Sequence, residues 1–306
     1  GRIAPERKQR MALLAEYDAL RGLGHACGHH MQGPAILGAA KALKDVAIDA
    51  PYTITVYGTP AEESISGKVV MLENGCTFEE LDVALMMHGG PATQVDVKSL
   101  ALNKLKIIYH GVCSHAALKP EKGRSALMAA CAAAMMMQGI PRSGEGTTRI
   151  AVGRLNAGEG RNVTPVHADM QLEVRDETGE INQYMVKNVE NIVEGVKRAY
   201  EVEAEIVKAG EATTLPSCPE VLDLIESVAK TVPGVESIER FNKPSGSEDC
   251  TLLIERVVQH GGRGAYFLFG CNHHGHHRAD FEIQDETSLP MAFNMFKGLA
   301  LRLNGI

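Results

Sequence analysis

Three strand-like runs near the start of the sequence each lead into residue types that bind metal ions. Residues 11–17 lead into the cluster Gly24-His25-Ala26-Cys27-Gly28-His29-His30, residues 52–58 into Pro60-Ala61-Glu62-Glu63, and residues 83–87 into His88. In an open parallel sheet, ligands collect outside the carboxyl ends of the strands. We therefore expect the three strand ends to converge on one site.

Helical periodicity around these strands predicts how the sheet is covered. Residues 33–46 and 66–74 carry apolar side chains at helical spacing. The same pattern resumes near the end of the chain, with predicted helices at 219–232 and 289–303 and a strand at 265–269. Strands that alternate with helices predict a mainly parallel sheet between helices, the α/β/α architecture.

The middle of the chain follows a different order, strand-helix-strand-strand-helix-strand. The predicted strands are 102–110, 148–156, 167–175 and 202–208, and the predicted helices are 125–138 and 180–200. This βαββαβ order is that of a ferredoxin-like sandwich. We predict an inserted domain at 102–212 and a discontinuous domain formed by 1–101 and 213–306.

Composition narrows the class of partner. The 31 Lys and Arg residues against 38 Asp and Glu give a net charge of −7, which disfavours binding to nucleic acid or an anionic membrane. The longest apolar run, 126–137, is about half of the roughly 20 residues that span a membrane, so it predicts a buried helix. A small-molecule partner fits best.

Cysteine usage and the start of the chain bear on the compartment. The seven cysteines are odd in number and contain no Cys-x-x-Cys pair, which disfavours a disulfide framework. Residues 11–20 are interrupted by Glu16 and Asp18, so they lack the apolar core of a signal peptide. We expect a cytoplasmic protein.

The spacing of Cys27 and His29 suits a metal ion. Residues two apart lie on the same side of an extended segment, and thiolate with imidazole favours Zn²⁺ or a related transition metal. The alternative is a glycine-rich turn with incidental polar residues. Glu62 and Glu63 are adjacent, so one can bind metal while the other accepts a proton from a metal-bound water. Their alternative is a helix N-terminus that favours acids.

Two histidine positions have competing interpretations. A histidine such as His88 at a strand end is more often a buried imidazole with a satisfied hydrogen bond than a ligand, but the other two strand ends favour the ligand. After the strand at 265–269, His273, His274, His276 and His277 crowd one loop. Most of these four belong to a solvated loop, and we expect one to complete the site.

Several motifs together resemble the M20 metallopeptidases, most closely the amidohydrolase branch of hippurate, aminobenzoyl-glutamate and auxin-conjugate hydrolases. In the family's order, they are Leu13-Leu14-Ala15-Glu16-Tyr17-Asp18-Ala19-Leu20, Gly24-His25-Ala26-Cys27-Gly28-His29, Pro60-Ala61-Glu62-Glu63, residues 83–88, His110-Gly111 with Ser114-His115-Ala116, Asn162-Val163-Thr164-Pro165, Ser247-Glu248-Asp249 and residues 277–281. The match runs over nearly the whole chain and is highly specific.

The resemblance implies a hydrolase with two divalent metal ions in each protomer that cleaves the amide of an N-acyl amino acid or similar small conjugate. The implied metal ligands are Cys27, His29, Glu63, His88 and His277, and the implied general base is Glu62. His277 is selected because it lies four residues before Phe281, with His276 or His274 as alternatives. Zn²⁺ or Mn²⁺ is expected and Co²⁺ is possible.

The inserted domain resembles the family's lid and dimerisation domain. The resemblance places His115 in the partner protomer's site as the donor that stabilises the oxyanion, and it assigns Asn162 and Arg175 to the substrate's carboxylate. It therefore implies a homodimer formed through the lid. Without it, His115 is a loop histidine and Arg175 a surface charge.

The chain departs from the family pattern in two places. His30 stands where Asp or Asn is usual, and Gln32 replaces a histidine, so the residues that orient the ligands differ. The chain also begins almost directly at its first strand, so either an upstream part is missing or the sheet is reduced. The competing functions are a dipeptidase or carboxypeptidase on the same site, and a catalytically inactive metal-binding or ligand-binding homologue.

Overall fold

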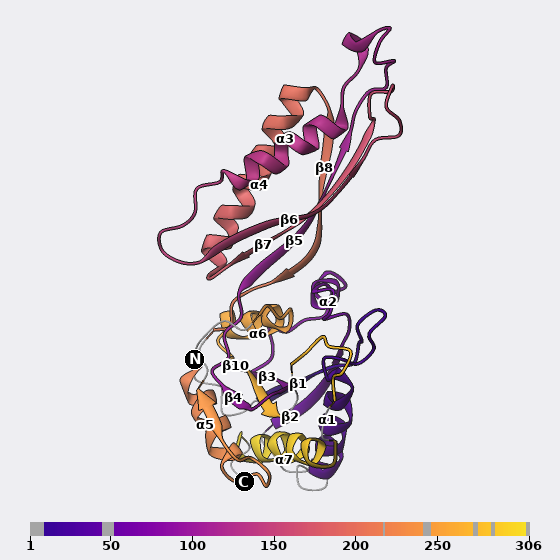
Figure 1. Ribbon diagram of the computed structural model, residues 1–306. Coiled ribbons are helices and arrows are strands. Elements are labelled where there is room, and N and C mark those ends of the chain that lie inside the picture. Colours follow the sequence, from indigo (N-terminus) through magenta and orange to yellow (C-terminus); the bar gives the residue numbers. More distant parts are fainter. Residues whose placement is uncertain are drawn as a thin grey trace. The chain divides into compact units, whose positions relative to one another are not determined.

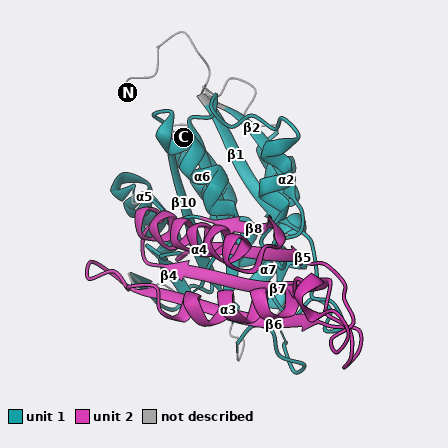
Figure 2. Ribbon diagram, turned by 90° about the horizontal axis from the view of Figure 1, so that it is seen from above, with its two compact units in different colours: residues 1–99, 213–306 teal, residues 100–212 magenta. Residues whose placement is uncertain are grey.

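The computed structural model describes residues 9–44, 52–216, 218–240, 246–271, 275–282 and 285–303. The chain divides into two compact units, coloured separately in Figure 2. Unit 1 comprises Gly1–Ser99 and Thr213–Ile306, and unit 2 comprises Leu100–Ala212. The roles predicted for the two parts of the chain stay predictions.

Unit 1 is built on a six-stranded sheet (Figure 1). Its strand order is β2 (Tyr52–Thr59), β1 (Gln9–Glu16), β3 (Val83–Gly90), β10 (Arg263–Gly270), β4 (Thr93–Val95) and β9 (Ile238–Arg240). β1 is parallel to β2 and β3, and β3 is parallel to β10. The carboxyl ends of all four strands therefore meet at one edge of the sheet, as the α/β prediction requires.

Helices cover both faces of this sheet because its strands are apolar on both sides. Along β1, Met11 and Leu13 belong to one core and Ala12 and Leu14 to another. The first core includes residues of α1 (His29–Leu43), α5 (Pro219–Ala229) and α7 (Asp285–Leu303). The second includes residues of α6 (Cys250–Gln259), which contacts the short helix α2 (Gly67–Glu73).

Three elements of unit 1 differ from the sequence prediction. Helix α1 begins at His29 instead of residue 33, because Gly28 adopts a left-handed conformation (φ 87°) that turns the chain directly into the helix. The prediction that Cys27 and His29 lie in one extended segment is therefore wrong. Helix α6 and the three-residue strands β4 and β9 were not predicted.

Unit 2 has the predicted ferredoxin-like arrangement. Its antiparallel sheet has the order β6 (Thr148–Ala157), β7 (His167–Asp176), β5 (Ala101–His110) and β8 (Glu203–Ala212). Helices α3 (Ala126–Gln138) and α4 (Gly179–Tyr200) pack on one face through a core that includes Ile107, Ala130 and Val193. A 3-10 turn, η1 (Pro120–Lys122), precedes α3. None of the helices in the described part of the chain combines the length and hydrophobicity needed to cross a membrane.

Candidate metal centre

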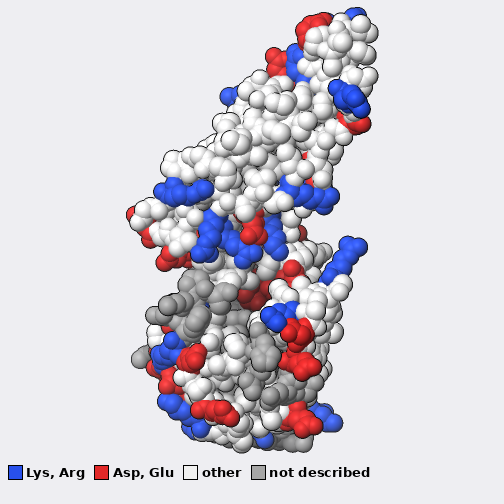
Figure 3. Space-filling model, in the orientation of Figure 1, with Lys and Arg blue, Asp and Glu red and all other residues white. Residues whose placement is uncertain are grey.

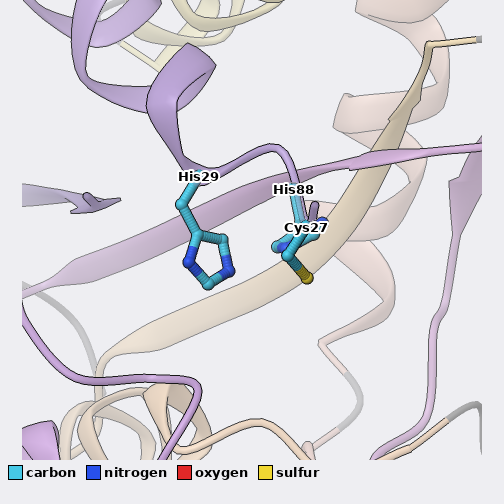
Figure 4. Close-up of side chains that lie close together, drawn as sticks. All are labelled: Cys27, His29 and His88. Atoms are coloured by element: carbon cyan, nitrogen blue, oxygen red, sulfur yellow. The ribbon is translucent and has the colours of Figure 1, made fainter. Parts of the chain in front are cut away.

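The residues expected at the three strand ends come together in unit 1. Cys27 lies in the turn after β1, His29 opens helix α1, and His88 lies within β3. All three side chains are buried, with 8%, 1% and 4% of their surface exposed. Figure 4 shows Cys27 beside His88, with the His29 ring next to them.

Distances between the polar atoms match those expected around a metal ion. Cys27 Sγ lies 3.6 Å from His88 Nε2, and His277 Nε2 lies 3.2 Å from Glu63 Oε2. Two tetrahedral ligands at Zn–N and Zn–S bond lengths are about 3.5 Å apart. The polar atoms form three overlapping groups, each within 4.8 Å: Cys27 with His29 and His88, Cys27 with Glu63 and His277, and His29 with Glu62 and Glu63.

A tight turn after β2 places Glu62 and Glu63 close to His29. Ala61 and Ile65 flank the pair with φ values of 55° and 56°, a left-handed conformation that costs energy for residues with a side chain. The turn closes on Gly67, where a Cβ atom would lie 1.5 Å from the carbonyl oxygen of Pro60. Only glycine fits there, so the position of both carboxylates depends on this contact.

Hydrogen bonds fix the orientation of the histidine rings. Asp18 Oδ1 lies 2.9 Å from His29 Nδ1, and Asp18 Oδ2 accepts from the backbone N–H of Glu63 at 3.0 Å. His88 Nδ1 donates to the carbonyl oxygen of Gly89 at 2.7 Å, which leaves Nε2 with its lone pair toward Cys27. Ligand histidines are commonly oriented by such carboxylate and carbonyl partners.

Burial and charge shift the pKa values of the site in a consistent way. Burial raises the pKa of the Cys27 thiol, and nearby carboxylates raise it further. Burial and the charge of Glu16 raise the pKa of Glu62 to about 8. Burial opposes protonation of His29, but its hydrogen bond to Asp18 and nearby carboxylates outweigh burial and raise its pKa to about 9. In all three groups the surrounding carboxylates raise the pKa, so the site favours positive charge, either a bound proton or a metal cation.

The donor set fits a metal ion. His29 Nε2 and Glu63 Oε1 are buried and make no hydrogen bond within the described residues. Buried polar atoms without a partner are costly, so two such atoms in the same group of ligand residues indicate that they bind a metal. Thiolate, imidazole and carboxylate together suit Zn²⁺ and related divalent ions.

The histidine loop after β10 supplies two side chains near the cluster. His277 contacts Glu63 and adopts φ 60°, and its backbone N–H donates to the carbonyl oxygen of Ala26 at 2.8 Å. His276 Nε2 lies 2.9 Å from the carbonyl oxygen of Gly89, and its ring lies 5.2 Å from that of His88. His274 lies outside the described residues. The choice of His277 as the ligand stays a prediction. It is favoured by the group that His277 forms with Cys27 and Glu63.

The three site residues predicted in unit 2 separate into two places. His115 and Asn162 lie in adjoining loops, since His115 pairs with Val163 and the N–H of Ala116 donates to the carbonyl oxygen of Asn162. Arg175 lies at the far end of β7, where it makes two hydrogen bonds to Glu173, of 2.9 and 3.2 Å. Unit 2 therefore brings His115 and Asn162 together and leaves Arg175 apart from them.

Comparison with known proteins identifies the family. Residues 10–302 match the model of Peptidase family M20/M25/M40. This chain belongs to that family. It is 34% identical over 288 residues to a p-aminobenzoyl-glutamate hydrolase homolog of Haemophilus influenzae, an alignment that covers 92% of this chain and 68% of the relative.

Two further similar proteins support the same assignment to the family. The indole-3-acetyl-aspartic acid hydrolase of Enterobacter agglomerans is 36% identical over 279 residues, covering 89% of this chain and 64% of the relative. The crystal structure of an aminobenzoyl-glutamate utilization protein from Klebsiella pneumoniae superimposes with a TM-score of 0.84 at 32% identity, over 96% of this chain and 71% of that one. The chain thus spans about two thirds of the length of its curated relatives. The predicted family, hydrolase class and α/β fold are confirmed.

Sequence reasoning missed several residues of this M20 site that support the predicted ligands. Asp18 orients His29 and Glu63, and its signal was its place within the family motif that follows the first strand. Glu16, Lys68 and Asp249 form a buried group beneath the site and are widely separated in sequence. No local pattern could have paired them.

Proposed function

We propose that this M20 family protein is a metal-dependent amidohydrolase that cleaves the amide bond of an N-acyl amino acid or a similar small conjugate. The observation that carries the proposal is the Glu62 carboxylate, which is 7% exposed and lies 3.7 Å from His29 within the ligand cluster. The names of the relatives, which describe hydrolases of aminobenzoyl-glutamate and indole-3-acetyl-aspartate, support this substrate class.

The ligand cluster is proposed to hold two divalent ions in each protomer. Cys27 is common to the groups containing His88 and His277, so its sulfur would help to hold both ions. Zn²⁺ suits the thiolate best, and Mn²⁺ or Co²⁺ suits the remaining imidazole and carboxylate donors. When bound, such ions polarise the amide carbonyl and lower the pKa of water to roughly 7.

Glu62 is proposed to move the proton of the reaction. Its carboxylate accepts a proton from the attacking water as the water oxygen bonds to the carbonyl carbon. It then returns the proton to the amide nitrogen as the C–N bond breaks, which releases the acid and the amine. A carboxyl whose surroundings bring its pKa toward neutrality is suited to both steps.

His115 is proposed to stabilise the oxyanion. Its Nδ1 accepts a hydrogen bond from the N–H of Ala117 at 3.2 Å, so Nε2 carries the ring hydrogen and is a donor. The side chain is exposed on its loop, as a group that serves a second copy of the chain must be. Asn162 and Arg175 are proposed to bind the substrate's free carboxylate, for which a guanidinium fork is the suitable partner. Because one copy of unit 2 holds the two residues apart, they would come from different protomers of the dimer.

We propose a cytoplasmic homodimer that forms through unit 2. Helix α3 has no charged residue, and it exposes Met128, Met135 and Met136 by 52%, 76% and 50%. Figure 3 shows few charged side chains over α3 on the visible face. An apolar helix surface of this kind is typical of an interface. None of the seven cysteines, all of which lie in the described part of the chain, forms a disulfide, which fits a reducing compartment.

A substrate screen tests the proposed function. Purified protein is stripped with a chelator, supplied with Zn²⁺, Mn²⁺ or Co²⁺, and incubated with aminobenzoyl-glutamate, indole-3-acetyl-aspartate, hippurate and acetyl-amino acids. We expect release of the free amino acid from at least one conjugate, and none without metal. Failure of every conjugate with all three metals contradicts the proposal.

A further inference from the structure

A buried lysine, Lys68, is linked to the metal centre through Glu16 and has no part in the proposed chemistry. Lys68, the second residue of α2, is 0% exposed, and among the described residues it is the only buried lysine or arginine. Its ammonium contacts Glu16 and lies 2.7 Å from Asp249 Oδ1. Both carboxylates are also 0% exposed. Burying three charges is costly unless all are paired, so the arrangement calls for an explanation.

The first consequence of this pairing concerns His29. Lys68 contacts one oxygen of Glu16, and Gln32 Nε2 donates to the other at 3.2 Å. The N–H of Glu16 in turn donates to Gln32 Oε1 at 2.9 Å. Held in this way, Glu16 Oε2 lies 3.4 Å from His29 Nε2, the atom that faces the cluster. Lys68 and Gln32 therefore fix the carboxylate that lies beside the Nε2 atom of His29.

The second consequence concerns the turn of Glu62 and Glu63. The N–H of Gly67, the residue before Lys68, donates to the carbonyl oxygen of Ala61 at 3.3 Å. The N–H of Lys68 donates to Asp249 Oδ2 at 3.2 Å, so main chain and side chain of Lys68 hold both oxygens of Asp249. Asp249 stands at the N-terminus of α6. Gly67 thus contacts the turn, and the next residue, Lys68, links it to Asp249 at the start of α6.

We propose that Lys68 is a positioning residue of the metal centre, which holds Glu16 under His29 and anchors the turn of Glu62 and Glu63 to α6. The proposal rests on the proposed metal-dependent function. It also explains Gln32, a departure from the family pattern, as the second residue that orients Glu16. The residues involved come from β1, α1, α2 and the start of α6.

The competing explanation is that the buried group only stabilises the fold. The two differ in what a mutation does to metal affinity, because a purely structural pair affects unfolding and leaves the ligands of the folded protein in place. A matched control is available in unit 2. Asn182 is 4% exposed, accepts from Asn103 at 2.6 Å and donates to Asp176 at 2.8 Å, so Asn182→Ala breaks a buried polar network that contains none of the predicted ligands.

The experiment compares the wild-type chain with Lys68→Met, Lys68→Arg, Gln32→Met and Asn182→Ala. Each is stripped of metal, and its affinity for Zn²⁺ is measured by competition with a chromogenic chelator, beside its melting temperature. We expect Lys68→Met to bind Zn²⁺ about 10- to 100-fold more weakly, as for other residues that orient ligands. We expect Lys68→Arg to recover part of the loss and Gln32→Met to show a smaller loss. Asn182→Ala should have a lower melting temperature and the same Zn²⁺ affinity as the wild type.

Each outcome decides between the explanations. Wild-type Zn²⁺ affinity in Lys68→Met overturns the proposal even if the melting temperature falls. Should Lys68→Met not fold, Gln32→Met carries the test, and wild-type affinity there overturns the proposal. Absence of Zn²⁺ binding by the wild type itself contradicts the proposed metal-dependent function instead, so the two failures are distinguishable.

Discussion

Four candidate residues of unit 1, Cys27, His29, Glu62 and His88, are buried, whereas His115 and Asn162 of unit 2 are exposed to solvent. His29 is 1% exposed and is fixed by Asp18, while the exposed His115 accepts a hydrogen bond at its Nδ1 atom from the backbone of its own loop. Unit 1 is thus organised in advance for its chemistry. The residues of unit 2 are available for contact with a substrate or a second copy of the chain.

Replacement of Glu62 in the buried unit should lower activity the most. Glu62→Gln keeps the shape of the side chain and removes the proton acceptor, so kcat should fall about 10²- to 10⁴-fold. Zn²⁺ binding should persist, because the group of Cys27, His29 and His88 is untouched. Glu220→Gln, an exposed acid of the same unit, is the matched control. Retention of activity by metal-loaded Glu62→Gln contradicts the role of Glu62.

Removal of His115 from the open unit should lower activity without changing metal content. A missing oxyanion donor costs about 10²- to 10³-fold in kcat, so His115→Ala should fall in that range. His167→Ala, another exposed histidine of unit 2, should stay near wild type. If His115 serves a second protomer, mixing His115→Ala with Glu62→Gln should restore part of the activity in the heterodimer. No restoration contradicts a role across the dimer.

Arg175 should act mainly on substrate binding. Loss of a charge-assisted pair with the substrate's carboxylate predicts a rise in KM of about 10- to 100-fold for Arg175→Met, with a smaller change in kcat. Arg198→Met, an exposed arginine of α4, serves as the control. Glu173→Gln removes the present partner of Arg175, so it should lower KM slightly. An equal KM in Arg175→Met and wild type refutes the assignment.

The metal-free protein should lose stability as the pH rises from 6.5 to 8. In this window the native state keeps protons on Glu62 (pKa about 8) and His29 (pKa about 9), whereas the unfolded chain has released them at ordinary values of 4.5 and 6.5. The free energy of unfolding therefore falls with pH. Burial lowers the pKa of His88 to about 3, so it contributes little here. Urea unfolding with chelator at both pH values checks the slope, and a flat or rising stability contradicts it.

The sequence predicted the strands that carry the ligands because their apolar runs and terminal residues are local signals. Helix α6 had a usable signal too, since Cys250, Leu253, Ile254 and Val257 follow helical spacing, but that signal was missed. β4 and β9 are three residues long, too short for a periodic pattern. Pairings such as Lys68 with Asp249 join residues 181 positions apart, and only the folded chain shows them.

Cys27 and His29 were predicted to lie in an extended segment of the loop before the helix at 33–46, and the backbone differs from that prediction. The left-handed conformation of Gly28 starts the helix at the next residue, His29. The ligand types were still predicted, because they depend on residue identity and strand order. Their exact geometry depends on the turn and on the partners Asp18 and Glu16.

A dinuclear centre in unit 1 is tested by metal analysis of stripped wild-type protein after equilibrium dialysis against Zn²⁺. We predict two ions per chain for the wild type, and fewer for Cys27→Ser, whose sulfur belongs to two of the ligand groups. Cys271→Ser, at a cysteine that is also buried, should bind as the wild type does. A wild type that retains no more Zn²⁺ than Cys27→Ser would contradict the dinuclear centre.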